Sequence, residues 1–200
     1  MKKFLQALAV GVVFLVVCGF IYPLLVMGIG QAAFPYQANG SLVKLNGQVV
    51  GSALIGQNFS DNRFFHGRVS AVNYNTFAAN EKPENMLPGS GSENLAVSNQ
   101  ALTARIERDV QAFLKANPSV SEKDLPAELF TSSFSGLDPD ISPAAASVQA
   151  DRIAAATGIG KDKIEGIIQD ATSGPELGVF GEPRVNVLKA NLEIYQLLHS

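Results

Sequence analysis

The feature that most constrains this chain is a long apolar run behind two lysines at its N-terminus. No charged side chain occurs between Lys3 and Lys44, and Phe4–Met27 is almost wholly apolar. With about 1.5 Å of rise per residue, this run predicts a helix of about 36 Å, enough to cross a hydrocarbon core of about 30 Å. A helix suits lipid because it pairs its backbone N–H and C=O groups within one segment. We therefore expect a transmembrane helix within residues 1–30.

Two other interpretations of the run are a cleaved signal peptide and a lipoprotein signal. Gly30-Gln31-Ala32 has the small residues of a cleavage site, but the apolar core of a signal peptide is only about 7–15 residues long. Leu15-Val16-Val17-Cys18 resembles a lipoprotein box, but bulky Val17 precedes the cysteine and the apolar run continues well past it. The length of the run favours a retained anchor.

The two lysines also predict the orientation of the chain, because positively charged flanks stay on the cytoplasmic side. We expect a single-pass protein of the plasma (inner) membrane with a cytoplasmic N-terminus. Residues 31–41 would form a linker, and residues 42–200 an extracytoplasmic (periplasmic) domain. Pro23 predicts a kink in the span, where it becomes a candidate contact with partner helices.

Charge and cysteine content narrow the class of the outer domain. Apart from Lys2 and Lys3, 13 basic residues stand against 18 acidic ones, a balance that argues against a nucleic-acid partner. The one cysteine, Cys18, lies in the span, so the domain is expected to have no disulfide and to depend on its core.

The rest of the chain predicts an α+β domain. Asn46-Gly47 between two short apolar runs is typical of a type I′ hairpin turn. Periodicity and capping residues indicate further elements. The expected elements are strands at 42–45, 48–51 and 184–188, and helices at 99–117, 142–156, 162–171 and 192–198.

The segment from Ser60 to Asn99 is rich in Asn, Ser, Gly and Pro and shows little periodicity. Forty such residues are too many for an idle loop in a compact domain, so we expect this segment to be functional or bound to a partner. The candidate partner contacts here are Phe64, Phe65, Arg68 and Tyr74.

No catalytic constellation is visible. His66 and His199 are far apart with no cysteine near them, so the spacing of metal ligands is missing. Gly160-Lys161 lacks the other residues of a phosphate-binding loop. Asp138 and Asp140 flank Pro139, a pattern that more often forms a turn and cap than a cation site. The residues alone predict a membrane-anchored interaction domain without catalytic activity, metal or intrinsic cofactor.

Four segments, in order and correctly spaced, resemble the C subunit of the Kdp potassium-transporting ATPase. The segments are GSALIGQNFSDNRFFHGRVSAVNYN (51–75), SGSENLAVSNQAL (90–102), SFSGLDPDISPAAASVQADR (133–152) and LGVFGEPRVNVLKANL (177–192). With the single N-terminal span, the resemblance covers essentially the whole chain.

The resemblance implies a function. The chain would be an accessory subunit of a high-affinity, ATP-driven potassium uptake complex that stabilises assembly and, as a catalytic chaperone, modulates the ATP-hydrolysing subunit. Its partners would be a potassium-channel-like subunit and a P-type ATPase subunit, together with membrane lipid. We expect the outer domain to lie over the potassium entrance. The alternative is a stand-alone, membrane-anchored sensor or solute-binding module with a ligand pocket near residues 60–99.

The resemblance also implies roles for single residues. Gln149 matches a glutamine implicated in nucleotide interaction, and ATP is the one ligand that the family suggests. Because ATP is cytoplasmic and the predicted position of Gln149 is outside, packing or capping is the simpler role for this side chain. We also expect Arg68 and Arg152 to bind backbone carbonyls, and an ion pair to close Glu182–Arg184. Turns or close approaches are expected at Gly56, Gly136, Gly178 and Gly181.

Overall fold

The computed structural model describes residues 1–76 and 88–199, which fall into two compact units, Met1–Ser52 and Ala53–Ser200. Residues 77–87 of the predicted partner-bound segment lie outside the described residues.

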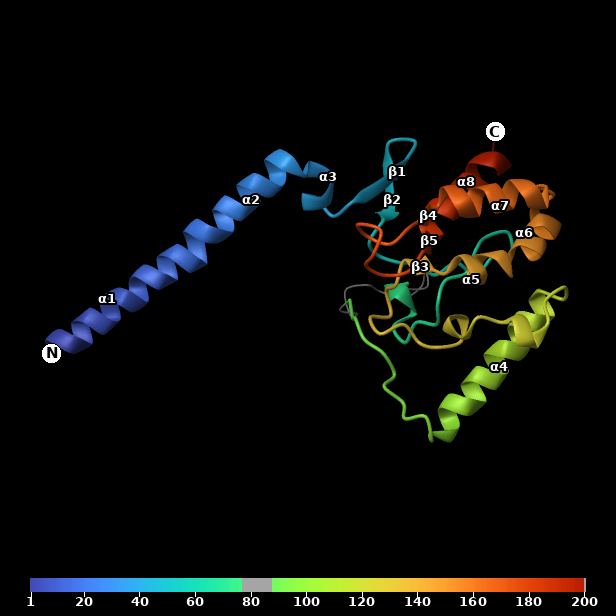
Figure 1. Ribbon diagram of the computed structural model, residues 1–200, viewed down its shortest axis with the longest axis horizontal. Coiled ribbons are helices and arrows are strands. Elements are labelled where there is room, and N and C mark those ends of the chain that lie inside the picture. Colours follow the sequence, from blue (N-terminus) through green and yellow to red (C-terminus); the bar gives the residue numbers. More distant parts are fainter. Residues whose placement is uncertain (77–87, 200) are drawn as a thin grey trace. The chain divides into compact units, whose positions relative to one another are not determined.

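The first unit begins with one long apolar helix, drawn in blue in Figure 1. It consists of α1 (Lys2–Val16), a π-helical turn (Val17–Ile21) and α2 (Tyr22–Ala33), and it runs for 32 residues with none buried. The π turn lies just before Pro23, whose ring would clash with the carbonyl of Gly19 in a regular α-helix. The amide of Tyr22 accordingly donates to the carbonyl of Val17, five residues back.

A short helix and a hairpin complete this unit. The helix α2 continues to Ala33 and α3 (Pro35–Ala38) adds another turn, so most of the predicted linker is helical. The antiparallel hairpin of β1 (Leu42–Leu45) and β2 (Gln48–Ser52) is confirmed. Asn46 and Gly47 have φ values of 51° and 81°, as a type I′ turn requires.

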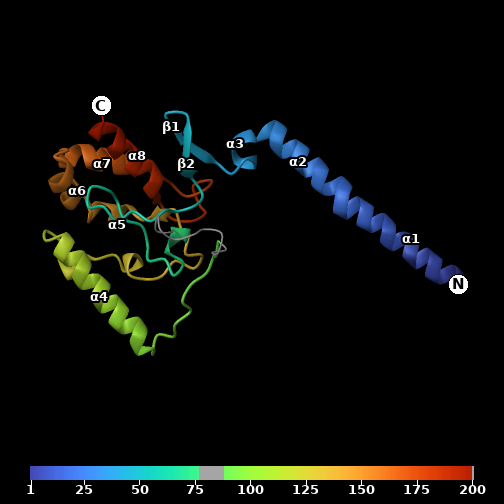
Figure 2. The ribbon, with the colours of Figure 1, turned by 180° about the vertical axis from the view of Figure 1, so that it is seen from behind.

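The second unit has a small antiparallel sheet with β5 (Arg184–Asn186) between β3 (Asp140–Ile141) and β4 (Thr172–Ser173). Figures 1 and 2 show helices gathered beside this sheet. They are α5 (Pro143–Ser147), α6 (Ala150–Thr157), α7 (Lys161–Asp170) and α8 (Val187–Leu198). The predicted α+β class is confirmed.

The helix α4 (Gln100–Ala116) runs apart from α5–α8 in both views. Its amphipathic pattern was sufficient to locate it, and Asn99 caps it by accepting a hydrogen bond from the amide of Ala101. Partly buried side chains on one face, Ile106, Val110 and Phe113, pack against the core. The Phe113 ring meets Phe130 edge to face, with 5.6 Å between centroids.

The core is built from isoleucines, alanines and valines of α5–α8, β3 and β5. Phe65 of the loop that precedes α4 joins them, together with Leu129 and Phe130. Ile164, Ile167 and Ile168 of α7 point inward as predicted. Phe65 is fully buried. A loop therefore supplies one of the largest side chains in a core that has no disulfide to support it.

Three predicted boundaries are wrong for local polar reasons. The helix expected at 142–156 is divided at Val148 and Gln149, because the Gln149 side chain donates to the Ala145 carbonyl and its backbone amide turns to Ala146. The strand expected at 184–188 ends at Asn186, and the helix expected at 192–198 already begins at Val187. Both differences arise because the Asn186 side chain accepts from the amide of Lys189 and caps α8.

Candidate functional site

Gln149 lies at the centre of a buried polar cluster. Its side chain is 0% exposed and uses both ends of its amide. The Oε1 atom accepts from the His66 amide at 2.9 Å and from Arg152 at 2.7 Å. The Nε2 atom donates to the carbonyls of His66, at 3.1 Å, and Ala145, at 3.0 Å. Gln149 thus joins α5 and α6 to a loop 83 residues away, in the manner of a packing residue.

Arg152, one turn further along α6, holds the same loop. Its guanidinium donates to the backbone carbonyls of Asn62 and Phe64 and to Oδ1 of Asn117. This bears out the expectation that Arg152 binds backbone carbonyls. Burial is the main cause that lowers the pKa of Arg152 to about 10.

Asn191 of α8 binds the same loop at Phe65. Its Oδ1 accepts from the Phe65 amide at 2.7 Å, and its Nδ2 donates to the Phe65 carbonyl at 2.9 Å. We name the set of Gln149, Arg152, Asn117 and Asn191 the amide cluster. It satisfies the backbone polar groups of a loop that would otherwise be buried unpaired.

His66 borders the amide cluster. Its Nε2 lies 3.1 Å from the Asp61 carbonyl, so a neutral ring protonated at Nε2 can donate there. Burial lowers the pKa of His66, and the charge of Arg152 lowers it further. His66 also lines a cavity of about 320 Å³ between its loop and α4, with walls that are mainly Phe113, Leu129 and Phe130.

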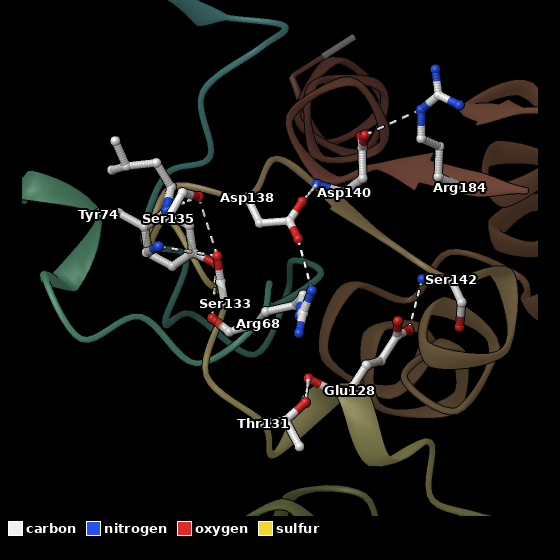
Figure 3. Close-up of polar contacts among 12 residues, drawn as sticks. Arg68, Tyr74, Glu128, Thr131, Ser133, Ser135, Asp138, Asp140, Ser142 and Arg184 are labelled. Carbon is white, nitrogen blue, oxygen red and sulfur yellow. Dashed lines mark hydrogen bonds and ion pairs between the residues drawn. The ribbon is translucent and has the colours of Figure 1, made fainter. Parts of the chain in front are cut away.

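A second network holds the segment 131–142, as Figure 3 shows. Arg68 and Asp138 point toward each other and form an ion pair of 2.9 Å. Arg68 was expected to bind a backbone carbonyl, but its Nη1 is used for this carboxylate. Asp138 also accepts from the Asp140 amide, a local hydrogen bond across Pro139 that leads directly into β3.

Tyr74 packs closely against this network. Its hydroxyl donates to the Arg68 carbonyl at 2.7 Å, and burial raises the pKa of Tyr74 to about 12. A Cβ atom at Gly56 would overlap both the Tyr74 ring and the Asp138 carbonyl. The expected close approach at Gly56 is therefore confirmed, and Gly136 has the expected positive φ, 68°.

The turn after β4 carries exposed apolar side chains. We name residues Glu176–Phe180 the apolar turn. Arg184 pairs with Glu176 at 2.7 Å and with Asp140 at 3.4 Å. The ion pair expected within Glu182–Arg184 is wrong, because the Arg184 side chain is directed to these two carboxylates instead.

The residues predicted to contact a partner are dispersed. Pro23 is exposed on α2, Phe64 is half-buried near Phe59, and Arg68 and Tyr74 belong to the network around segment 131–142. These contacts stay predictions. The burial of Phe65 gives its side chain a role in the core. Among residues 1–76 and 88–199, no group of three or more His, Cys, Asp or Glu side chains is placed to hold a metal ion.

Sequence reasoning missed Asn117, Asn191 and the exposure of the apolar turn. Asn191 had a signal, since it lies on the same helix face as the buried Val187 and Ile194. An amide on an apolar face indicates a buried polar contact. The partner of that contact lies 126 residues away and has no local signature.

These features define a class: a protein with one apolar N-terminal helix, consistent with single-pass anchoring, and a domain whose buried polar groups serve the fold. Comparison with known proteins names the family. Residues 4–196 match the model of KdpC, the c chain of the K⁺-transporting ATPase. The chain belongs to the KdpC family and is a non-catalytic subunit of the Kdp potassium-transporting ATPase.

Similar proteins extend over nearly the whole chain. A potassium-transporting ATPase KdpC subunit of Clostridium kluyveri is 54% identical and covers 96% of this chain and 91% of its own length. One of Clostridioides difficile is 49% identical over 99% of both chains, and one of Bacillus cereus is 50% identical over 92% and 91%. The alternative of a stand-alone sensor finds no support in these relatives.

Proposed function

We propose that this subunit binds the other Kdp subunits through its apolar helix within the plasma membrane. Its outer domain, residues 42–200, then works as a structural element. The observation that carries the proposal is the helix Lys2–Ala33, which is long enough to span a bilayer and has none of its residues buried. Such a surface requires lipid or other apolar helices around it. Lys2 and Lys3 support a cytoplasmic N-terminus.

The partners that fit this surface are the potassium-channel-like subunit and the P-type ATPase subunit of the same complex. The π turn and Pro23 interrupt the regular helix surface at its middle. Interruptions of this kind are tolerated in membranes where neighbouring helices contact the freed backbone groups. We therefore propose that a helix of a partner subunit contacts this helix at Pro23.

The experiment compares two forms of the subunit that are expressed with the rest of the complex. In one form a secretion signal replaces Phe4–Met27, and in the other an unrelated apolar span of equal length replaces it. We expect both forms to lose co-purification with the large subunits in mild detergent. Normal assembly of the form without a span would overturn the proposal. Normal assembly of the swapped form would also contradict it, because the helix would then serve only to anchor the subunit in the membrane.

For Gln149 we propose a packing role in place of the nucleotide contact that the family suggests. All of its amide hydrogen-bonding groups are paired inside the domain, which supports this role. Gln149→Ala should lower the thermal midpoint of the subunit and leave the KM for ATP of the assembled pump unchanged. A raised KM with an unchanged midpoint would instead favour nucleotide binding.

A further inference from the structure

The apolar turn exposes three large side chains to solvent. Leu177 is 89% exposed, Val179 77% and Phe180 66%. They lie within five residues of one another, at the tip of the connection between β4 and β5. Single exposed apolar residues are common on protein surfaces, but a compact group of this kind is typical of an interaction site.

The turn has a defined backbone. Glu176 and Phe180 exchange two backbone hydrogen bonds, at 2.8 and 3.0 Å, and the amide of Gly178 donates to the Pro175 carbonyl at 3.0 Å. The pair between Glu176 and Arg184 joins the turn to the first residue of β5. The three apolar side chains are therefore presented by a preorganised loop, which lowers the entropy cost of binding.

The tight turn places Leu177 in a backbone conformation that is unfavourable for a branched aliphatic residue. Its φ is +54°, in the left-handed region that Gly and Asn adopt readily and that a branched aliphatic residue avoids. Leu177 is also almost fully exposed, so it adds no core packing in return. A residue that conflicts with both its backbone and its environment indicates a role outside the fold.

We propose that the apolar turn is a docking element that inserts into another subunit of the same ATPase. This inference rests on the proposed function, that is, on assembly with the other subunits. The receiving surface is an apolar depression with basic side chains at its border. Leu177, Val179 and Phe180 fill the depression, and Glu182 faces the basic border.

The charge around the turn favours another subunit as the binding partner over a lipid surface or a second copy of this chain. Glu176 and Glu182 flank the apolar side chains, and Arg184 is already paired with Glu176 and Asp140. Anionic lipid surfaces attract Lys and Arg, so an acidic border opposes binding to such a surface. In a two-fold symmetric contact with a second copy, equivalent turns would bring their own glutamates together. A protein surface with basic side chains at its border avoids both the repulsion from anionic lipid and the repulsion between glutamates of two copies.

The experiment uses the full chain expressed with the complex. Leu177→Asn and Phe180→Gln remove apolar surface from the turn, and Val97→Asn removes it from an equally exposed site elsewhere. We expect Leu177→Asn to reduce recovery of the large subunits at least tenfold, while the thermal midpoint of the subunit stays equal or rises because Asn tolerates the left-handed region. Val97→Asn should behave as wild type.

A photo-crosslinking amino acid at position 179 identifies the occupant. A crosslink to a large subunit supports the proposal, whereas a crosslink to lipid or to a second copy overturns it. Wild-type recovery with Leu177→Asn and Phe180→Gln would also overturn it and leave the proposed function intact. Failure of the wild-type chain itself to co-purify would instead contradict the proposed function.

Discussion

At the scale of single residues, the domain depends on amides and one guanidinium more than on ion pairs. Arg152 and Gln149 lie one helical turn apart and bind backbone groups of residues 62–66. Their importance was predictable, because both stand in a segment that matches the family and Arg152 was expected to bind carbonyls. The identity of the bound loop was not predictable, because its hydrogen bonds span more than 80 residues of sequence.

His66 makes the stability of the domain depend on pH. Its pKa is lowered in the fold, by burial first and by Arg152 second, below the value of about 6.5 for an unfolded chain. The unfolded chain therefore takes up a proton first as the pH falls. We expect full stability above pH 6.5 and a loss of at most about 1.4 kcal/mol per pH unit below it.

Urea unfolding of the full chain in detergent, between pH 7.5 and 5.5, measures this loss. His66→Gln keeps a donor for the Asp61 carbonyl but cannot titrate, so its free energy of unfolding should vary less over the same interval. Equal pH dependence in both proteins would show that another group is responsible.

At the scale of elements, the boundaries that failed are those set by side-chain amides. The hairpin, α4 and α7 were predictable because turn residues, caps and periodicity all act locally. Asn186 instead acts in two directions. Its Oδ1 caps α8, while its Nδ2 donates to the Ala53 carbonyl and to Asp140, both at 3.0 Å. Val185 and Val187 alternate with polar residues as in a strand, so the sequence pattern did not indicate the change from strand to helix at Asn186.

Asn186→Ala should therefore cost more than the loss of an ordinary cap. An exposed cap contributes about 1 kcal/mol, whereas two further buried hydrogen bonds raise the expected loss to about 2–3 kcal/mol. The measurement is the free energy of unfolding in urea. Asn99→Ala, at the exposed cap of α4, is the matched control and should lose about 1 kcal/mol. Equal losses at both sites would contradict the double role of Asn186.

At the scale of the whole molecule, the α+β class and the single apolar helix followed from the sequence. The packing of the loop at residues 59–66 did not, because no local pattern indicates which helices receive Phe65. The last helix, α8, is the decisive one. It contributes Val187, Leu188, Ala190 and Ile194 to the buried interior and Asn191 to the amide cluster.

Deletion of residues 187–200 should unfold the second unit. Burial of each large apolar side chain stabilises by about 1.5–3 kcal/mol, so the loss approaches the total stability of about 5–15 kcal/mol that is usual for a domain. Limited proteolysis of membranes that contain the variant should leave no resistant fragment. Deletion of residues 199–200 alone is the control and should preserve the fragment.

The hydrogen bonds between Phe65 and Asn191 also determine how early the domain can fold during protein synthesis. The two residues are 126 positions apart, which corresponds to between about 6 and 25 s of bacterial protein synthesis. Throughout this interval the loop that carries Phe65 has emerged without its partner helix. The apolar N-terminal segment is made before either residue. Membrane targeting can therefore begin well before the domain can fold. The loop with Phe65 must avoid aggregation until α8 has been synthesised.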